Sequence, residues 1–274
     1  MRIARVMALL MAGGLAAGAC GSAPARRGSP ENGLSSPTSG PGAPPPPVGR
    51  AVVGDTGLGE AVVLDDDRTL VVEATFGCGG PPKLVAQVEK ATVELRLVTA
   101  TVAAGTVCAT VLGFGPVTTT LSVPLGDRRL VTSTDAPIVE VRQAELVAPR
   151  YLPGGYRLRI VVPGVRVPVG SAVSAPCATE LYVDPEGSGA PVAIAECLGA
   201  AMPRPPVGWS VLPPATIGGA AALVAEVSSA GSVYGRSITW SAGGNGLVVE
   251  TGLAGNGKQV PGEPALVAMA NHLH

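Results

Sequence analysis

Few side chains in this 274-residue chain could serve as a general base or an activated nucleophile. The only histidines, His272 and His274, lie at the extreme C-terminus, where chains usually fray. Two ligands at that spacing on a tail make a poor metal site without further donors. The chain also lacks the Gly-x-Ser-x-Gly and Ser-x-x-Lys motifs of serine hydrolases. We therefore expect no nucleophilic hydrolase, no metal and no other cofactor.

Paired carboxylates are the remaining candidates for acid and base chemistry. A glycosidase needs two of them at a defined separation across a cleft. Sugar sites also tend to offer aromatic platforms, and aromatic residues make up only 3% of this chain. We expect the glutamates in or near the predicted strands to face solvent, and keep a carboxylate-dependent hydrolase as an alternative. These glutamates are Glu73, Glu94, Glu140, Glu180, Glu196 and Glu226.

Two segments come close to ligand-binding loops without completing the motif. Residues Gly252–Gln259 resemble a phosphate-binding loop, but Gln259 replaces the Ser or Thr that would hold magnesium, and Pro261 follows at once. Asp65–Asp67 could offer carboxylates to calcium, but the spaced ligands and distal Glu of a calcium loop are missing. We interpret both as turns and expect no nucleotide ligand.

Composition and charge limit the possible partners. Nineteen Lys and Arg are scattered along the chain against twenty Asp and Glu, which leaves a net charge of −1. A nucleic-acid-binding protein needs a basic face that displaces counterions. The sequence therefore predicts no nucleic-acid partner.

The N-terminus follows the pattern of a secretion signal. Arg2 and Arg5 precede an apolar stretch from Val6 to about Leu15, and small residues follow up to Cys20. The apolar stretch is too short to span a bilayer, which takes about 20 residues. We expect residues 1–19 to be a cleaved signal peptide.

The segment Leu15–Cys20 resembles the lipobox of bacterial lipoproteins, which implies a diacylglyceryl group on Cys20. Ala17 stands where that motif usually has Leu, and Ala17–Ala19 also fits ordinary signal cleavage, so secretion without a lipid is the alternative. Residues 20–50 are rich in Pro, Gly and Ser, and predict an extended tether. We expect a protein anchored by lipid to the outer face of the plasma membrane.

The other four cysteines favour disulfide bonds. An exported chain meets an oxidising environment, and no CxxC motif or nearby histidine indicates a metal or redox site. Four cysteines allow three connectivities. We predict the sequential one, Cys78–Cys108 and Cys177–Cys197, because it closes the shortest loops and keeps each bridge within one predicted domain.

A mainly β fold follows from the composition and from the alternation of apolar and polar residues. The core must consist chiefly of Val, Leu, Ala and Ile, and 38 Gly and 27 Pro suit many short strands joined by turns. For residues 51–143 we predict a β-sandwich-like domain, with Glu89-Lys90 as a bend between two strands. Alternating runs lie at 70–75, 84–89, 93–98, 118–123 and 138–141.

Residues 144–274 predict an α+β domain. Strands are expected at 156–162, in a hairpin formed by 179–183 and 190–197, and in a hairpin formed by 237–241 and 247–251. After Pro264 the apolar period changes to that of a helix. We expect Trp240 in the core, and Trp209 either packing a loop onto the sheet or exposed for docking.

Several segments resemble actinobacterial extracytoplasmic lipoproteins of unknown function. They are Cys78–Leu84 and Pro124–Val131. The second half is similar to uncharacterised modules in envelope proteins of Gram-positive bacteria, through Leu152–Tyr156, Trp240 and the final Leu266–Leu273. The resemblance implies a location in the cell envelope and the predicted mainly β architecture, but it implies no activity and no catalytic residue.

These observations lead to one functional hypothesis and two alternatives. We expect a non-enzymatic binding or sensor module that contacts another envelope component, such as a protein. The first alternative is a carrier of a hydrophobic ligand such as a lipid, since a Val- and Leu-lined sheet against a helix can enclose a cavity. The second is the carboxylate-dependent hydrolase.

Overall fold

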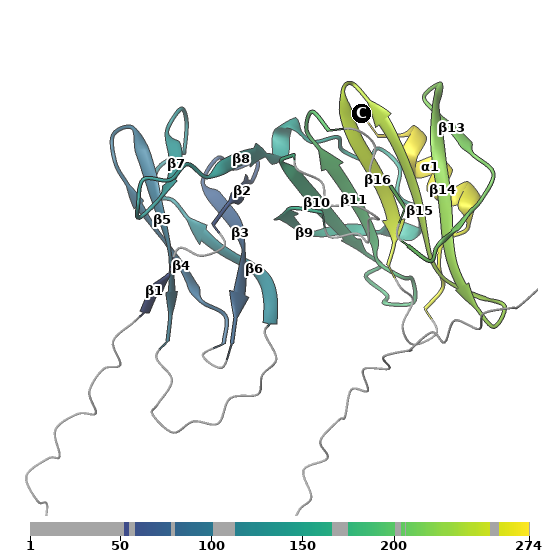
Figure 1. The fold of residues 1–274 in the computed structure, drawn as a ribbon, viewed down its shortest axis with the longest axis horizontal. Coiled ribbons are helices and arrows are strands. Elements are labelled where there is room, and N and C mark those ends of the chain that lie inside the picture. The colour runs from purple at the N-terminus through teal and green to yellow at the C-terminus, as the bar shows by residue number, and fades with distance from the viewer. Residues whose placement is uncertain are drawn as a thin grey trace, which may run out of the picture. The chain divides into compact units, whose positions relative to one another are not determined.

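The computed structural model describes the strand backbone at 52–54 and residues 58–77, 80–100, 113–165, 175–200, 204–205, 207–252 and 258–273 (Figure 1). Residues 47–274 belong to one compact unit. The described part is mainly β with a single C-terminal helix, as the sequence predicts. No helix in these ranges is long and apolar enough to cross a membrane.

Two four-stranded sheets form the first half of this unit. One has the order β6-β3-β2-β8, from Gly113–Thr120, Thr69–Phe76, Glu60–Val63 and Val139–Arg142. The other has the order β1-β5-β4 with β7 also paired to β5, from Val52–Gly54, Thr92–Thr99, Lys83–Val88 and Arg129–Thr132. The predicted bend is present, because β4 and β5 pair antiparallel and Glu89 donates its backbone N–H to Thr92.

A shared apolar core lies between these two sheets. It contains Val63 and Leu70 from one sheet, and Leu84 and Leu95 from the other, all 2% exposed or less. Each residue comes from a strand whose alternate positions point to one face. This arrangement confirms the predicted sandwich-like packing.

Two parallel strand pairs link segments that are distant in sequence. Strand β8 pairs parallel to β2, with Val141 beside Val62, and β7 pairs parallel to β5, with Leu130 beside Val93. Local alternation predicts the strands but not these neighbours, because parallel pairing depends on a long crossover rather than on a turn.

An eight-stranded sheet forms the second half. Its main path is β12-β14-β15-β16-β11-β10-β9, and β13 also pairs with β14. The path runs through Ser210–Val211, Ala220–Ser229, Ser232–Ala242, Asn245–Thr251, Val192–Cys197, Cys177–Val183 and Arg157–Pro163, and β13 is Ala215–Ile217. Both predicted hairpins are present, β10–β11 and β15–β16. Gly243 and Gly244 have φ of 59° and 87°, the left-handed conformation that a tight two-residue hairpin turn requires.

Helix α1, Glu263–Asn271, covers one face of this sheet (Figure 1). Pro264 lies in its first turn, where the missing N–H costs nothing. Leu266, Met269 and Ala270 are buried against Ile238 and Val249 of the sheet. The predicted helix and its apolar face are therefore confirmed.

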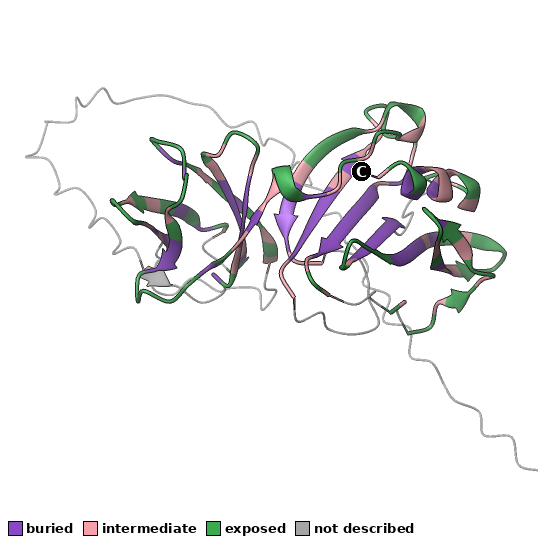
Figure 2. Cartoon of the chain, turned by 90° about the horizontal axis from the view of Figure 1, so that it is seen from above, coloured by how far each residue is buried: buried purple, intermediate pink, exposed green. Residues whose placement is uncertain are grey.

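Both faces of the central strands are buried. All six residues of β11 are buried, and so are Gly246–Thr251 of β16 (Figure 2).

A further apolar cluster joins the two halves, with Val62 and Val71 from the first and Val161 and Val162 from the second. Between the halves lie two short 3-10 turns, Gln143–Glu145 and Pro153–Gly155.

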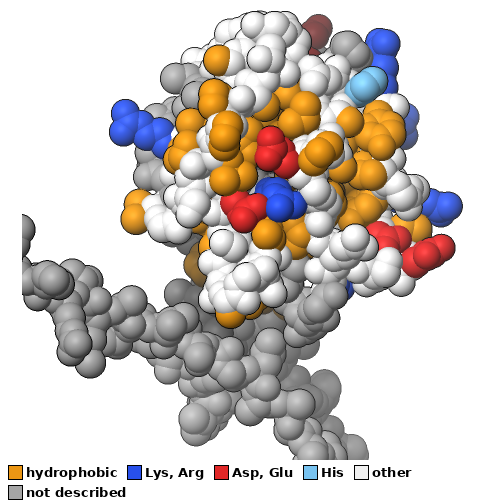
Figure 3. All heavy atoms as spheres, turned by 90° about the vertical axis from the view of Figure 1, so that its right-hand side faces the viewer, with side chains coloured by type: hydrophobic (Ala, Val, Ile, Leu, Met, Phe, Trp, Pro, Cys, Tyr) orange, Lys and Arg blue, Asp and Glu red, His pale blue; other side chains and the backbone are white. Residues whose placement is uncertain are grey.

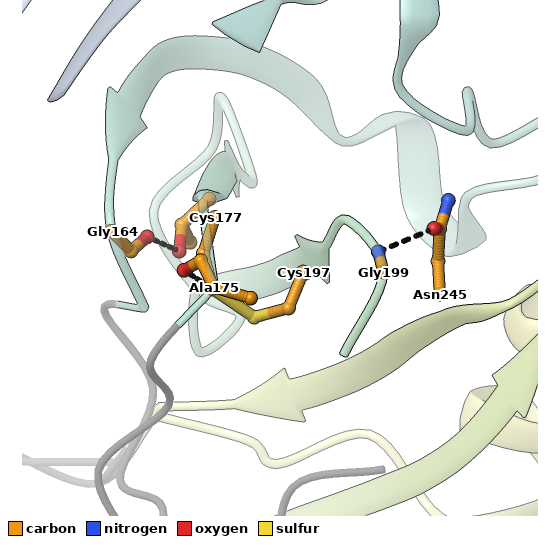
Figure 4. The surroundings of a disulfide bond; sticks show 7 residues. Gly164, Ala175, Cys177, Cys197, Gly199 and Asn245 are labelled. Carbon is orange, nitrogen blue, oxygen red and sulfur yellow. Dashed lines mark hydrogen bonds between the residues drawn. A yellow bond between two sulfur atoms is a disulfide. The ribbon is translucent and has the colours of Figure 1, made fainter. Parts of the chain in front are cut away.

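The predicted Cys177–Cys197 disulfide joins β10 to β11 (Figure 4). The two cysteines stand directly opposite each other in the antiparallel pair. Cys78 and Cys108, the other predicted bridge, lie outside the described residues, as do Cys20 and the segments predicted to be a signal peptide and a tether.

Candidate functional site

The most promising site is a cavity of about 610 Å³ at one end of the eight-stranded sheet, which we call the α1 pocket. Its walls come from the β15–β16 turn, the β13–β14 turn, the end of α1, Glu196 of β11 and the segment after Gln143. The volume lies within the range of small-molecule sites, roughly 300 to 1,000 Å³. On the side of the molecule that carries β13, β14 and α1, hydrophobic side chains gather around a few charged ones (Figure 3).

One wall of the α1 pocket is apolar. Trp240 of β15 and Leu247 of β16 are register partners on the face that α1 covers. Ile217 and Ala220 from the β13–β14 turn and Leu273 after α1 complete this wall. Trp240 is only 3% exposed, which confirms its predicted core position. Its indole N–H donates no hydrogen bond to any residue that the structure describes.

Glu196 lies beside Leu247, its register partner, on the same face of the sheet, and its side chain is 3% exposed. Its Oε1 accepts a 2.7 Å hydrogen bond from Nδ2 of Asn245, and its Oε2 a 2.8 Å bond from the backbone N–H of Val147. Asn245 is held in turn, because its Oδ1 accepts the N–H of Gly199 at 3.0 Å (Figure 4). The carboxylate is therefore fixed in place by neutral donors.

Two further polar side chains line the α1 pocket. Asn271 accepts the N–H of Gly218 at 2.9 Å and donates to the carbonyl of Val267 at 3.0 Å, so its amide is already engaged. Glu145 is exposed and makes no hydrogen bond or ion pair with a described residue. The side chains that can still form polar contacts with a ligand are therefore mainly those of Glu145, Glu196 and Trp240.

A second buried carboxyl, Glu180, lies near Glu196 on the same face. It is 5% exposed, and its Oε2 accepts a 2.6 Å bond from the Tyr182 hydroxyl. Burial raises the pKa of Glu180, and the negative charges of Asp65 and Glu196 raise it further, against the hydrogen bonds from Tyr182 and Gln143. The pKa of Tyr182 is raised as well, by burial and by its bond to Glu180.

The third buried carboxyl, Glu250, lies on the other face of the sheet. It pairs in register with Ser237 and Ala193, which alternate with the residues that α1 covers. Glu250 is 2% exposed, and neither its Oε2 nor the Oγ of Ser237 has a hydrogen-bond partner. Burial raises the pKa of Glu250 to about 8. The sequence analysis did not single out this residue. The one available indication was a single Glu within the otherwise uncharged segment Leu247–Thr251.

The prediction that strand glutamates face solvent is wrong for Glu180 and Glu196. Both faces of their strands are covered, so alternation no longer assigns polar residues to water. Other glutamates pair with nearby arginines: Glu94 with Arg96, Glu140 with Arg142 and Glu226 with Arg236. Glu73 is half-buried. No described group of three or more Asp, Glu, His or Cys is placed to hold a metal ion.

The acidic segment Asp65–Asp67 forms the turn between β2 and β3, as predicted. Asp66 accepts the backbone N–H groups of Arg68 and Thr69 and the Thr69 hydroxyl, which lowers its pKa. Asp67 binds the guanidinium of Arg142 and the N–H of Gly126. These carboxylates therefore stabilise turns.

The other residues singled out in the sequence either have a structural role or lie outside the described residues. Trp209 packs its ring over Gly235, where a Cβ would come within 3.2 Å of it, so this tryptophan holds a loop against the sheet. His272 follows α1, and its Nδ1 lies 2.7 Å from the carbonyl of Ala268. His274 and residues 253–257 of the phosphate-loop-like segment are outside the described ranges.

Comparison with known proteins adds no assignment. No protein-family model matches the chain, and neither a curated protein sequence nor a solved structure gives a significant match.

Proposed function

We propose that this chain is a lipid-anchored protein of the cell envelope that acts by non-enzymatic binding, with the α1 pocket as its binding site. The observation that carries the proposal is the fixed carboxylate of Glu196 beside the apolar residues Trp240 and Leu247 on one face of the sheet. Binding sites of this kind combine apolar walls with a few oriented polar groups.

The secondary structure around the pocket supports a role in ligand binding. Glu196, Trp240 and Leu247 stand on neighbouring strands of one sheet, and strands hold side chains more precisely than loops do. The described lining contains no Cys, His, Lys or Arg. Glu250, whose pKa burial raises to about 8, does not line the pocket, so we base no hydrolase on it.

The binding site is tested with a substitution that fills it. Ala242 lines the pocket, is exposed and shares the face of Trp240 by alternation, so Ala242→Phe should occupy the cavity without disturbing the core. Native mass spectrometry of protein purified from an envelope should reveal a bound component that this variant loses. Ala221→Phe, exposed on β14 and outside the lining, is the matched control.

The mass of the bound component separates the alternatives. A protein-sized or small polar mass supports the binding module, whereas a lipid-range mass that Ala242→Phe removes would favour the hydrophobic carrier. A component that survives Ala242→Phe binds elsewhere, and would contradict the assignment of this pocket.

The anchor is tested by the mass at Cys20 and by membrane association. Protein from a host that processes lipoproteins should carry a diacylglycerol on Cys20 and sediment with membranes. Cys20→Ala should release it into the soluble fraction. An unmodified Cys20 at the mature N-terminus would instead show a secreted protein.

A further inference from the structure

All the charged side chains that line the α1 pocket, among the described residues, are acidic. Glu145 and Glu196 line it, and no Lys, Arg or His side chain is among the described residues of its wall. Elsewhere in the described chain, Glu94, Glu140 and Glu226 each have an arginine partner. The carboxylates of the pocket, in contrast to these three, have no arginine partner among the described residues.

Glu196 is the more informative of the two acids because it is buried. Its two hydrogen bonds come from an amide and a backbone N–H, both neutral, and it makes no ion pair with any residue that the structure describes. A buried carboxylate is costly unless it is paired as well as hydrogen-bonded. A ligand that brings a positive charge would supply the missing partner.

The rest of the lining fits an apolar body attached to that charge. Trp240, which lines the pocket, offers the apolar edge of an indole ring. Leu247, Ile217 and Leu273 extend the apolar wall. The amides of Asn245 and Asn271 are already engaged on both sides, so little remains for the several hydroxyl groups of a sugar.

We propose that the α1 pocket binds a small organic cation, an ammonium group carried on an apolar body. This assignment rests on the proposed function, since it names the ligand class of the same pocket. The ammonium group lies between Glu196 and Glu145, and its alkyl or aromatic part lies against Trp240 and Leu247.

The test compares three probes of equal length and different charge: hexylammonium, hexanol and hexanoate. Binding to the full chain is followed through the indole N–H signal of Trp240 in NMR spectra of a Trp209→Phe background, which leaves one tryptophan. We expect hexylammonium to bind about tenfold more tightly than hexanol, the scale of one well-placed charge interaction. Hexanoate should bind most weakly.

Two variants connect the preference to the carboxylates. Glu196→Gln keeps the size of the side chain and should bring hexylammonium and hexanol to similar affinity. Glu145→Gln, at an exposed position where folding is not at risk, should reduce the preference by a smaller factor. Glu186→Gln removes one negative charge from an exposed site outside the pocket and should leave the preference unchanged.

The outcomes separate the ligand class from the pocket itself. Equal affinity for hexylammonium and hexanol in the unmodified protein would overturn the cation assignment and leave the pocket as a binding site. If none of the probes shifts the Trp240 signal, both this inference and the proposed binding site fail. A preference for hexylammonium that survives both pocket variants would likewise contradict the role of these carboxylates.

Discussion

Ser237 of β15 and Glu250 of β16 stand opposite each other in the eight-stranded sheet, and each presents a buried oxygen without a hydrogen-bond partner. Buried polar groups are nearly always satisfied, so two neighbouring exceptions are unusual. They lie on the face opposite α1, at a place where the flanking residues on β11 and β14 are alanines, Ala193 and Ala225. We expect the buried carboxyl of this pair to make the stability of the protein depend on pH.

Glu250 should make the folded state less stable as the pH rises. Its pKa is about 8 when folded, against an ordinary value of 4.5, so the folded state holds a proton that the unfolded state releases between these values. The free energy of unfolding should therefore fall from about pH 5 to about pH 8, by at most about 1.4 kcal/mol per pH unit. Urea unfolding at several pH values measures this slope.

The variant Glu250→Gln should flatten that slope, because the amide does not ionise. The difference in free energy of unfolding between Glu250→Gln and the unmodified protein should therefore shift in favour of the variant as the pH rises, and level off above about pH 8. Glu186→Gln, which is exposed, should leave the slope as it is. An equal slope in the unmodified protein and Glu250→Gln would mean that another group governs the pH dependence.

Removing the Ser237 hydroxyl should cost little stability. The hydroxyl has no partner, so Ser237→Ala should change the free energy of unfolding by less than about 1 kcal/mol, or raise it. Ser188→Ala is the contrasting variant, because that hydroxyl donates a 2.7 Å bond to Asp184. Chemical denaturation of both variants checks the prediction, and a large loss in Ser237→Ala would reveal a bond to the hydroxyl.

Asn245→Asp should destabilise the protein in a pH-dependent way. It replaces the amide that donates to Glu196 at 2.7 Å with a second carboxyl, and two carboxylates this close repel each other. We expect a loss of about 1 to 3 kcal/mol at neutral pH, and a smaller loss at acid pH, because protonation of either carboxyl would relieve the repulsion. Thermal unfolding at both pH values measures it.

Asn271→Asp is the matched control for that substitution. Asn271 bonds only to backbone groups, of Gly218 and Val267, so the new charge would face no carboxylate partner. If both variants lose stability with the same pH dependence, repulsion from Glu196 is not the cause.

The Cys177–Cys197 disulfide should stabilise the fold and preserve the α1 pocket. The bridge spans 20 residues, and a loop of this length contributes about 3 kcal/mol through the entropy of the unfolded chain. The double variant Cys177→Ala with Cys197→Ala should lose roughly that amount in urea unfolding. Because Cys197 directly follows Glu196, we also expect weaker binding of hexylammonium. Unchanged stability would show that strand pairing alone holds β10 to β11.

Local sequence patterns predicted most of the secondary structure. Alternation located β3, β4, β5 and β9 within a few residues, since period two reflects the geometry of a single strand. The turn residues between their strands located the hairpins β10–β11 and β15–β16, although β15 begins at Ser232, five residues before the predicted start. The shift to a helical period after Pro264 located α1 for the same reason. Leu158 departs from the alternation, because this residue of β9 is 43% exposed rather than buried.

The candidate site was much less predictable. Trp240 was expected in the core, and the pairing of Cys177 with Cys197 follows from loop length, but Glu196 and Asn245 lie 49 residues apart in the chain. Their contact depends on β16 pairing with β11 on the edge opposite its hairpin partner β15. Glu145 and Val147 reach the same pocket from the segment between the two halves.

The sequence by itself determined the mainly β character, the hairpins, the final helix and the Cys177–Cys197 bridge, because each depends on residues close together in the chain. Only the tertiary structure decided which polar side chains are buried. Glu180, Glu196 and Glu250 have the same local pattern as solvent-facing strand residues, yet both faces of their sheet are covered. Burial is a property of what packs on a strand from elsewhere, and local alternation carries no information about that.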